Sequence, residues 1–153
     1  MRRFMRLSPM RLSFFCLPLF LAACSILGGG APALLTEVEY GTYRNGVRVA
    51  QTDGVPRELG LSFGYRVMVA KEAKSPVKAR IVTVTPGLIA PSESKTLTEY
   101  LNEATLEPGK TYDVFFTFAE PWQMATGRWE IRVEPAQADP LTRAFDVYNP
   151  GRQ

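Results

Sequence analysis

The chain of 153 residues contains no histidine, which removes the base of every Ser-His or Cys-His couple and the commonest protein ligand of metal ions. Both of its cysteines fall within the first 24 residues, and its four aspartates lack the D-x-D spacing of a calcium loop. A calcium site assembled from oxygen atoms of separate loops stays open as an alternative. The sequence therefore predicts no enzyme, no cofactor and no metal.

The basic excess of the chain lies at its amino terminus. Four arginines occur among the first eleven residues, no acidic residue precedes Glu37, and an apolar run follows at 12–21. A basic segment, a short apolar stretch and small residues are typical of a secretory signal. The apolar run is shorter than the roughly 20 residues that span a bilayer, and Pro18 interrupts it. We predict a signal peptide at 1–23, with a cytosolic chain that has an apolar end as the alternative.

The predicted signal ends in Leu21-Ala22-Ala23-Cys24, which resembles the lipobox of bacterial lipoproteins. The resemblance implies cleavage after Ala23, a diacylglyceryl thioether on Cys24 and acylation of the new amino terminus. Ser25 stands where an aspartate would signal retention at the inner membrane in enteric bacteria. The resemblance therefore implies an outer-membrane anchor facing the periplasm of a Gram-negative host. Ordinary secretion with a free thiol is the alternative.

Removal of residues 1–23 takes away four arginines and changes the formal side-chain charge from +3 to −1. Nucleic-acid binding then loses the basic footprint it needs. No disulfide is expected, because Cys16 leaves with the signal and Cys24 is alkylated. Three successive glycines at 28–30 predict a flexible, lipidated linker at 24–35, since they carry no side chain to pack. A single domain at 36–150 follows the linker.

Alternating apolar residues predict short strands through most of this domain. In the clearest strand, six apolar side chains occupy every second position: Leu59, Leu61, Phe63, Tyr65, Val67 and Val69. Asn45-Gly46 predicts a hairpin turn between strands at 37–44 and 47–51. Further strands are predicted at 77–85, 95–102, 112–118, 128–134 and 142–148, with loops at 52–56 and 86–93. Seven to eight short strands without a helical period indicate an all-β, antiparallel sandwich.

Two patterns resemble catalytic arrangements and are better explained otherwise. Gly60–Gly64 matches the G-x-S-x-G nucleophile elbow, which needs a sharp turn into a helix and a histidine base. The chain has no histidine, and the strand alternation continues through Ser62, so the match is accidental. Glu130 and Glu134 alternate with arginines at 128 and 132, which indicates a solvated charge ladder on one face of a strand.

Three aromatic residues are candidate contacts for a binding partner. Tyr43 lies beside the hairpin turn, Trp122 follows Pro121 in a loop, and Phe115 must leave the apolar face that its neighbour Phe116 occupies. Aromatic side chains within a polar rim are common in binding surfaces. In the alternative interpretation Trp122 plugs the end of the sandwich and a loop covers Phe115.

Several short motifs, in this order along the chain, resemble a bacterial domain family of unknown function: Glu39-Tyr40-Gly41-x-Tyr43, Gln51-Thr52-Asp53 with Pro56, Leu61-x-Phe63-Gly64-Tyr65, Phe118-x-Glu120-Pro121-Trp122 and Gly127-x-Trp129. The similarity covers 37–147. It implies a small immunoglobulin-like β-sandwich, often exported, with no settled activity. The segment 135–140 is longer than the tight hairpin expected there, which leaves the register of the last strand open.

These features together predict a lipid-anchored envelope protein that acts as a non-catalytic binding or scaffolding module for another envelope protein. A periplasmic lipoprotein that binds a glycan or a peptide is the alternative. An exposed sheet edge or a flat aromatic patch would favour the first function, and a concave pocket with converging polar groups would favour the second.

The lipid anchor leads to a direct prediction about membrane association. Cys24→Ala removes the sulphur that carries the diacylglyceryl group, so we expect the protein to leave the membrane fraction, as measured by cell fractionation and immunoblotting. Cys16→Ala is the control and leaves the distribution unchanged, because this cysteine is cleaved off with the signal. A Cys24→Ala protein that stays with the membranes would contradict the anchor.

Overall fold

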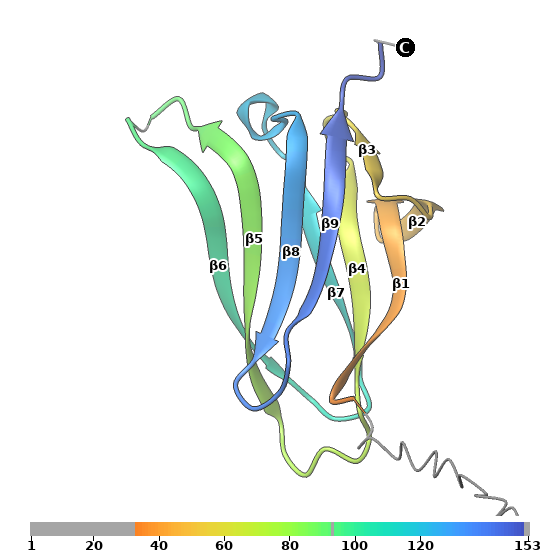
Figure 1. Cartoon of the computed structure of the whole chain (residues 1–153). Helices are drawn as coiled ribbons and strands as arrows, with labels where there is room; N and C mark the ends of the chain where they lie inside the picture. Colours follow the sequence, from red (N-terminus) through yellow and green to blue (C-terminus); the bar gives the residue numbers. More distant parts are fainter. Residues whose placement is uncertain (1–32, 93, 152–153) are drawn as a thin grey trace, which may run out of the picture.

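The computed structural model describes residues 33–92 and 94–151. Within them, nine strands form two sheets that pack face to face (Figure 1). The four-stranded sheet has the order β2 (Val47–Ala50), β1 (Leu35–Arg44), β4 (Ser62–Val69) and β7 (Thr111–Thr117). The five-stranded sheet has the order β3 (Gly54–Pro56), β9 (Leu141–Tyr148), β8 (Gly127–Pro135), β5 (Val77–Ile89) and β6 (Thr96–Leu106). One short 3₁₀ helix, η1 (Pro121–Gln123), lies between β7 and β8. The predicted all-β sandwich is confirmed.

The hairpin between β1 and β2 is formed by the residues that the sequence indicated. Asn45 and Gly46 have φ angles of 51° and 76°, and two positive values are what a two-residue hairpin turn requires. The last strand, whose register the sequence left open, pairs antiparallel with β8 through Trp129 opposite Phe145 and Ile131 opposite Arg143. The long connection at 136–140 therefore joins two neighbouring strands in a regular ladder.

Two segments that the sequence predicted as loops are partly strands, and each contains a proline. The predicted loop at 52–56 contains β3, which pairs parallel with β9 as an edge strand and raises the strand number to nine. The predicted loop at 86–93 begins too early, because β5 continues through Pro86 to Ile89. The register shifts between Val84 and Leu88, and a bulge there accommodates the proline.

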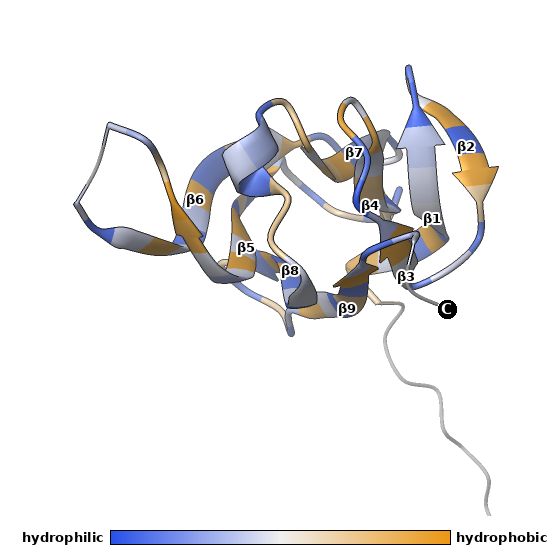
Figure 2. Ribbon diagram, turned by 90° about the horizontal axis from the view of Figure 1, so that it is seen from above, coloured by the Kyte–Doolittle hydropathy of each residue, from blue (hydrophilic) through white to orange (hydrophobic). Residues whose placement is uncertain are grey.

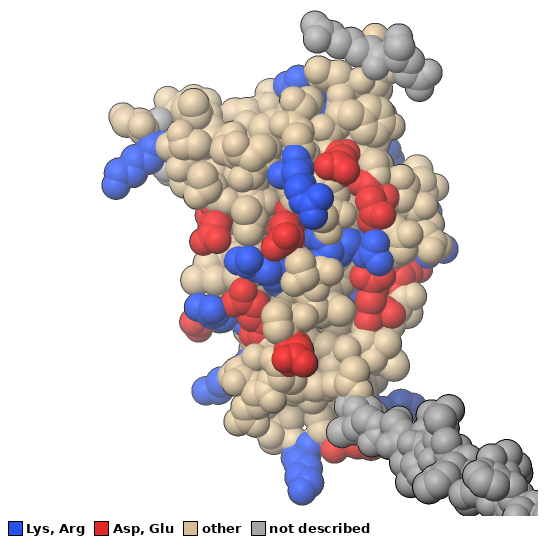
Figure 3. Space-filling model, viewed as in Figure 1, with Lys and Arg blue, Asp and Glu red and all other residues tan. Residues whose placement is uncertain are grey.

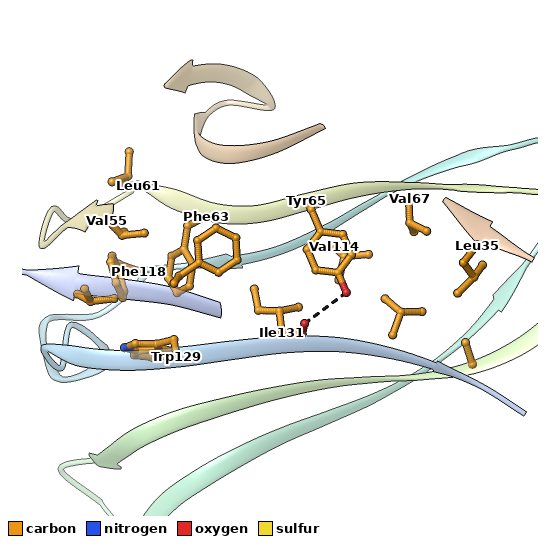
Figure 4. Close-up of a cluster of buried hydrophobic side chains, with 14 of the residues drawn as sticks. Leu35, Val55, Leu61, Phe63, Tyr65, Val67, Val114, Phe118, Trp129 and Ile131 are labelled. Carbon is orange, nitrogen blue, oxygen red and sulfur yellow. Dashed lines mark hydrogen bonds between the residues drawn. The ribbon is translucent and has the colours of Figure 1, made fainter. Parts of the chain in front are cut away.

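The core lies between the sheets and is built around the ring of Phe63 (Figure 4). Ring centroids of four other aromatic residues lie 5.3–5.9 Å from its own: Phe116, Phe118, Trp129 and Phe145. Inclined rings at such distances attract each other beyond the area they bury. Trp129 is itself fully buried and donates its indole N–H to the carbonyl of Ala125 at 3.0 Å. Figure 2 shows apolar and polar residues alternating along strands of both sheets.

One of the six predicted apolar positions of the central strand is not in the core. Leu59 is 54% exposed, whereas the other five are buried. The chain turns between Glu58 and Leu61, whose N–H donates to the carbonyl of residue 58 at 3.2 Å, so β4 begins only at Ser62. A turn breaks the period-2 alternation, which is why Leu59 points to solvent although its spacing is correct.

A single arginine joins the two sheets at the side where β1 and β9 lie. Arg143 of β9 donates to both carboxylate oxygens of Glu37 on β1 at 2.8 and 2.7 Å, and to Asp53 at 2.9 Å. Its guanidinium also lies 3.5 Å from the ring centroid of Tyr40. A bulge between Glu37 and Glu39 places Glu37 and Tyr40 on the same side of β1. These contacts close one side of the sandwich.

The tyrosine at the centre of β4 makes a second connection between the sheets. The Tyr65 hydroxyl, fully buried, donates to the carbonyl of Leu141 at 2.8 Å and lies 3.3 Å from that of Ile131 (Figure 4). Burial raises the pKa of this phenol well above its ordinary value.

We therefore expect Tyr65→Phe to lower the free energy of unfolding by about 1–2 kcal/mol, because it leaves a buried carbonyl without its donor. Urea denaturation followed by tryptophan fluorescence measures the change. Tyr148→Phe is the matched control, since Tyr148 is 48% exposed, and its effect should stay within about 0.5 kcal/mol. Equal losses in the two variants would show that the hydroxyl of Tyr65 contributes nothing specific.

Candidate functional site

The outer edge of the five-stranded sheet is formed by β6. This strand of 11 residues pairs along one side with β5 and has no neighbour on its other side among the described strands. The backbone N–H and C=O groups of that side are therefore open to another strand. Figure 2 shows β6 at one side of the sandwich, with the loop between β5 and β6 projecting from it.

The three other edge strands of the described sheets are shorter. β3 has three residues and ends in Pro56, β2 has four, and β7 has seven. Proteins commonly protect edge strands with lysine, proline or a bulge. The sequence of β6, TLTEYLNEATL, contains neither lysine nor proline. It is thus the longest of these edges, and its only charged residues are Glu99 and Glu103.

The side chains of β6 divide between the two faces of the sheet. Tyr100 turns toward the core, where its ring centroid lies 5.4 Å from that of Phe116. Residues 99, 101 and 103 alternate with it and face outward. Leu101 is 58% exposed, and Glu99 lies 3.7 Å from Arg132 of β8. The outward face of the edge therefore presents an apolar side chain between two carboxylates.

A shallow hollow lies beside this edge on the outer face of the sheet. Its lining includes four residues with charged side chains: Lys78, Arg80, Glu103 and Glu134. Arg80 and Glu134 are paired with each other at 2.7 Å. Two of the charged groups therefore bind each other within the hollow.

The outer face of the other sheet carries two of the aromatic candidates. Tyr43 of β1 and Phe115 of β7 stack with their ring centroids 4.0 Å apart and an interplanar angle of 25°. They reach each other across β4 because Gly64, which pairs with Phe115, has no side chain. A Cβ added to Gly64 would lie 2.0 Å from the carbonyl oxygen of Val114, and its φ is +150°. Phe115 thus leaves the apolar face, as the sequence predicted.

An arginine covers this aromatic pair. The guanidinium carbon of Arg66 lies 5.6 Å from the Tyr43 centroid and 5.9 Å from that of Phe115. Arg66 also binds Asp113 and Glu39 at 2.6 Å each and donates to the carbonyl of Gly46 in the hairpin turn at 2.6 Å. The cation–π contacts and ion pairs hold the hairpin against the sheet.

The consequence for Tyr43 is complete burial. Its exposed fraction is 0%, its hydroxyl has no hydrogen-bond partner within the described residues, and burial raises its pKa to about 12. The side chain therefore packs inside the domain and offers no surface to a partner. Trp122 lies in η1 and packs, partly buried, against the core cluster. The structure thus brings Tyr43 and Phe115 together and leaves Trp122 apart from them.

The remaining sequence motifs have structural explanations. Ser62 of the G-x-S-x-G pattern lies in β4 and shares a hydrogen bond of 2.7 Å with the hydroxyl of Thr117. In the predicted charge ladder, Arg132 lies 3.4 Å from Glu130 and 3.2 Å from Glu134. Figure 3 shows charged side chains of both signs across the middle of the outer face of the five-stranded sheet.

Among residues 33–92 and 94–151, no three side chains that bind metals are grouped closely enough to hold an ion.

The predicted signal peptide, the cleavage after Ala23 and the lipid attachment at Cys24 lie outside the described residues. Within the part of the chain that the structure describes, no helix has the length and hydropathy needed to cross a bilayer.

Comparison with known proteins supports the architecture. An immunoglobulin-like protein from Pseudomonas aeruginosa has a similar structure, with a TM-score of 0.62 and 27% sequence identity over 78% of this chain and 100% of that chain. The domain is therefore an immunoglobulin-like β-sandwich, as the family resemblance implied. The sequence matches no protein-family profile, and no curated protein matches it.

The glycine beneath the aromatic pair gives a prediction about stability. We expect Gly64→Ala to lower the free energy of unfolding by more than about 3 kcal/mol, because the new methyl group would overlap the carbonyl of Val114. Gly60→Ala is the control: Gly60 has a φ of +77° and no heavy atom within 4 Å of the added Cβ, so only backbone strain of about 1 kcal/mol applies. Urea denaturation measures both, and equal losses would contradict the steric role of Gly64.

Proposed function

We propose that the protein is a lipid-anchored, non-catalytic binding module of the bacterial envelope, and that it holds another envelope protein by accepting a strand of that protein at the β6 edge. The observation that carries the proposal is the long edge of β6, which contains no lysine or proline and has no strand neighbour on its outer side among the described strands. Addition of a strand supplies main-chain hydrogen bonds for affinity, and alternate side chains supply specificity. The lipobox of the sequence supports the anchor and an outer-membrane position facing the periplasm.

The side chains of the edge favour a particular kind of partner strand. Glu99, Leu101 and Glu103 face outward at successive alternate positions, and β6 contains no basic residue. A strand with basic side chains on either side of an apolar one would complement this row. A second copy of β6 would not, because antiparallel pairing centred on Leu101 places Glu99 opposite Glu103, and like charges that face each other across strands are destabilising.

The alternative function, a periplasmic lipoprotein that binds a glycan or peptide, would use the hollow beside β6. The Arg80–Glu134 pair already satisfies two of the charged groups there. A small ligand would have to break this pair to bind both groups, whereas an added strand at β6 uses backbone groups that have no strand neighbour. We therefore favour the edge as the binding element.

Site-specific photo-crosslinking in the native host tests the proposal. A photoreactive amino acid is placed in turn at Leu101, Asn102 and Glu103 of β6, and at Val47 and Val49 of β2 as controls; these valines are 69% and 61% exposed. We expect one defined partner to crosslink along β6 with a dependence on alternate positions, and not at β2. Crosslinks of equal strength at β2, or none at β6, would contradict strand addition at this edge.

A charge-reversal variant separates specific binding from proximity. Glu99→Lys with Glu103→Lys changes the sign of the edge without touching the core, and we expect about a tenfold loss of the crosslinked product at Leu101, a change that corresponds to about 1.4 kcal/mol. Glu58→Lys with Asp146→Lys is the matched control: Glu58, like Glu99, pairs with one arginine, and Asp146 is an exposed residue of β9, which β8 and β5 separate from β6. Melting temperatures show whether each variant is folded, and equal losses in both variants would exclude a specific role for the β6 carboxylates.

A further inference from the structure

The turn between β1 and β2 consists of an asparagine followed by a glycine, a pair that can react within the chain. Asn45 and Gly46 are both exposed, and a Cβ added to Gly46 would have no heavy atom within 4 Å. Neither the side-chain amide of Asn45 nor the N–H of Gly46 makes a hydrogen bond within the described part of the chain. The Gly46 nitrogen is therefore unhindered next to the side-chain carbonyl of Asn45.

An asparagine in this situation forms a cyclic imide with its own backbone. The Gly46 nitrogen attacks Cγ of Asn45 and forms a new C–N bond, and the side-chain nitrogen leaves as ammonia with the proton that the attacking nitrogen gives up. Water then adds to one of the two imide carbonyls. Opening at the side-chain carbonyl yields aspartate, and opening at the main-chain carbonyl yields isoaspartate. Glycine favours ring closure because it has no Cβ and few restrictions on its dihedral angles.

The other asparagines of the chain each lack one requirement of this reaction. Asn102 is followed by Glu103 within β6, where a side chain on the attacking residue and an extended backbone paired with β5 oppose ring closure. Asn149 is followed by Pro150, whose nitrogen carries no hydrogen. Asn45 is thus the one asparagine of the sequence that precedes a glycine.

The chain also has one aspartate–glycine pair, and its contacts restrain it. An aspartate before a glycine forms the same imide by loss of water. The carboxylate of Asp53 accepts a hydrogen bond from Arg143 at 2.9 Å, and the N–H of Gly54 donates to the Oγ1 of Thr52 at 3.0 Å. Both reacting groups of this pair are therefore held in place, whereas those of the turn between β1 and β2 are not.

Isoaspartate in this turn changes the hairpin that covers Tyr43. It adds one carbon to the backbone, and a two-residue turn with positive φ at both positions does not fit a longer link. The carbonyl of Gly46 accepts a hydrogen bond at 2.6 Å from Arg66, which lies over the Tyr43 ring. All of β2 is exposed, and β1 is its strand neighbour in the described sheet. Beyond that pairing, Arg48 of β2 binds Glu39 at 3.2 Å.

We propose that Asn45 is a site of spontaneous modification, at which the chain and water convert the asparagine to isoaspartate and release β2 from the sheet. The reaction needs no enzyme and no cofactor. Because the ammonia is lost, the fraction of converted molecules increases with the age of the folded protein. The edge formed by β6 belongs to the other sheet and stays intact. The inference stands independently of the lipid anchor and of strand addition at β6.

Peptide mapping of aged protein tests the modification. Protein purified from its host is held in mildly alkaline buffer, either folded or in urea, and its tryptic peptides are analysed by chromatography and mass spectrometry, which distinguish asparagine, aspartate and isoaspartate. In the folded protein we expect Asn45 to convert at least about tenfold faster than Asn102, with isoaspartate as the larger product. Asn149 stays unchanged, and Asp53 forms isoaspartate only in urea, where its restraining contacts are lost.

Three results would overturn the proposed site. Equal rates at Asn45 and Asn102 in the folded protein would exclude a specific reaction at the turn. Conversion of Asn45 in urea alone would show that the folded turn protects it. Aspartate without isoaspartate would exclude the imide, because direct hydrolysis of the side-chain amide yields aspartate only.

Hydrogen exchange measures the effect on the hairpin. In the converted protein we expect the amides of β2 to exchange at least about tenfold faster than in fresh protein, while those of β6 are unchanged. Asn45→Gly is the matched control, because two successive glycines keep the positive φ angles of the turn and offer no side chain that can form the ring. After the same treatment its β2 amides exchange as in the fresh variant.

A second variant separates the added charge from the longer backbone. Fresh Asn45→Asp protein carries the new carboxylate on an unchanged backbone, and we expect its β2 amides to stay as protected as in fresh protein with asparagine. Loss of protection in this variant equal to that of the converted protein would assign the effect to charge. Equal exchange of β2 in converted and fresh protein would contradict its release.

Discussion

The packing of aromatic rings around Phe63 is the interaction on which the rest of the structure depends. No cysteine occurs among the described residues, so the two sheets are held together without a covalent link. The ring of Phe63, on the four-stranded sheet, meets Trp129 and Phe145 of the other sheet at 5.5 and 5.3 Å. Rings of this size bury a large apolar area in a small domain. The aromatic rings on the two inner faces therefore provide the main contact between the sheets.

The sequence predicted the strands well wherever one face is buried and the other is solvated. Alternation identified β4, β7 and β8, and the turn residues Asn45 and Gly46 identified the first hairpin. The failures share a physical cause: β3, the end of β5 and the exposed Leu59 depend on long-range pairing or on a turn, which local patterns do not encode. Composition around Pro56 and Pro86 indicates loops, yet an edge position and a bulge accept these prolines.

The sequence predicted the fold better than it predicted which candidate binding residues are exposed. The adjacent phenylalanines correctly indicated that Phe115 leaves the core face. Tyr43 stacks on Phe115 and is fully buried because Gly64 leaves room between them and Arg66 covers the rings. Both residues are distant from Tyr43 in the sequence, so local patterns could not predict this contact. The β6 edge escaped notice for a related reason, since whether a strand lies at an edge is a property of sheet order and not of its own residues.

The positions of the first and last strands have a mechanical consequence. The chain enters β1 at one end of the sandwich and leaves β9 at the other (Figure 1). Tension between the two termini would run parallel to the strands, and the hydrogen bonds between β1 and β4 lie perpendicular to them. Such a load shears the whole ladder at once instead of opening it bond by bond. Because Arg143 binds β9 directly to Glu37 of β1, separating the first and last strands along the long axis would also have to break this ion pair.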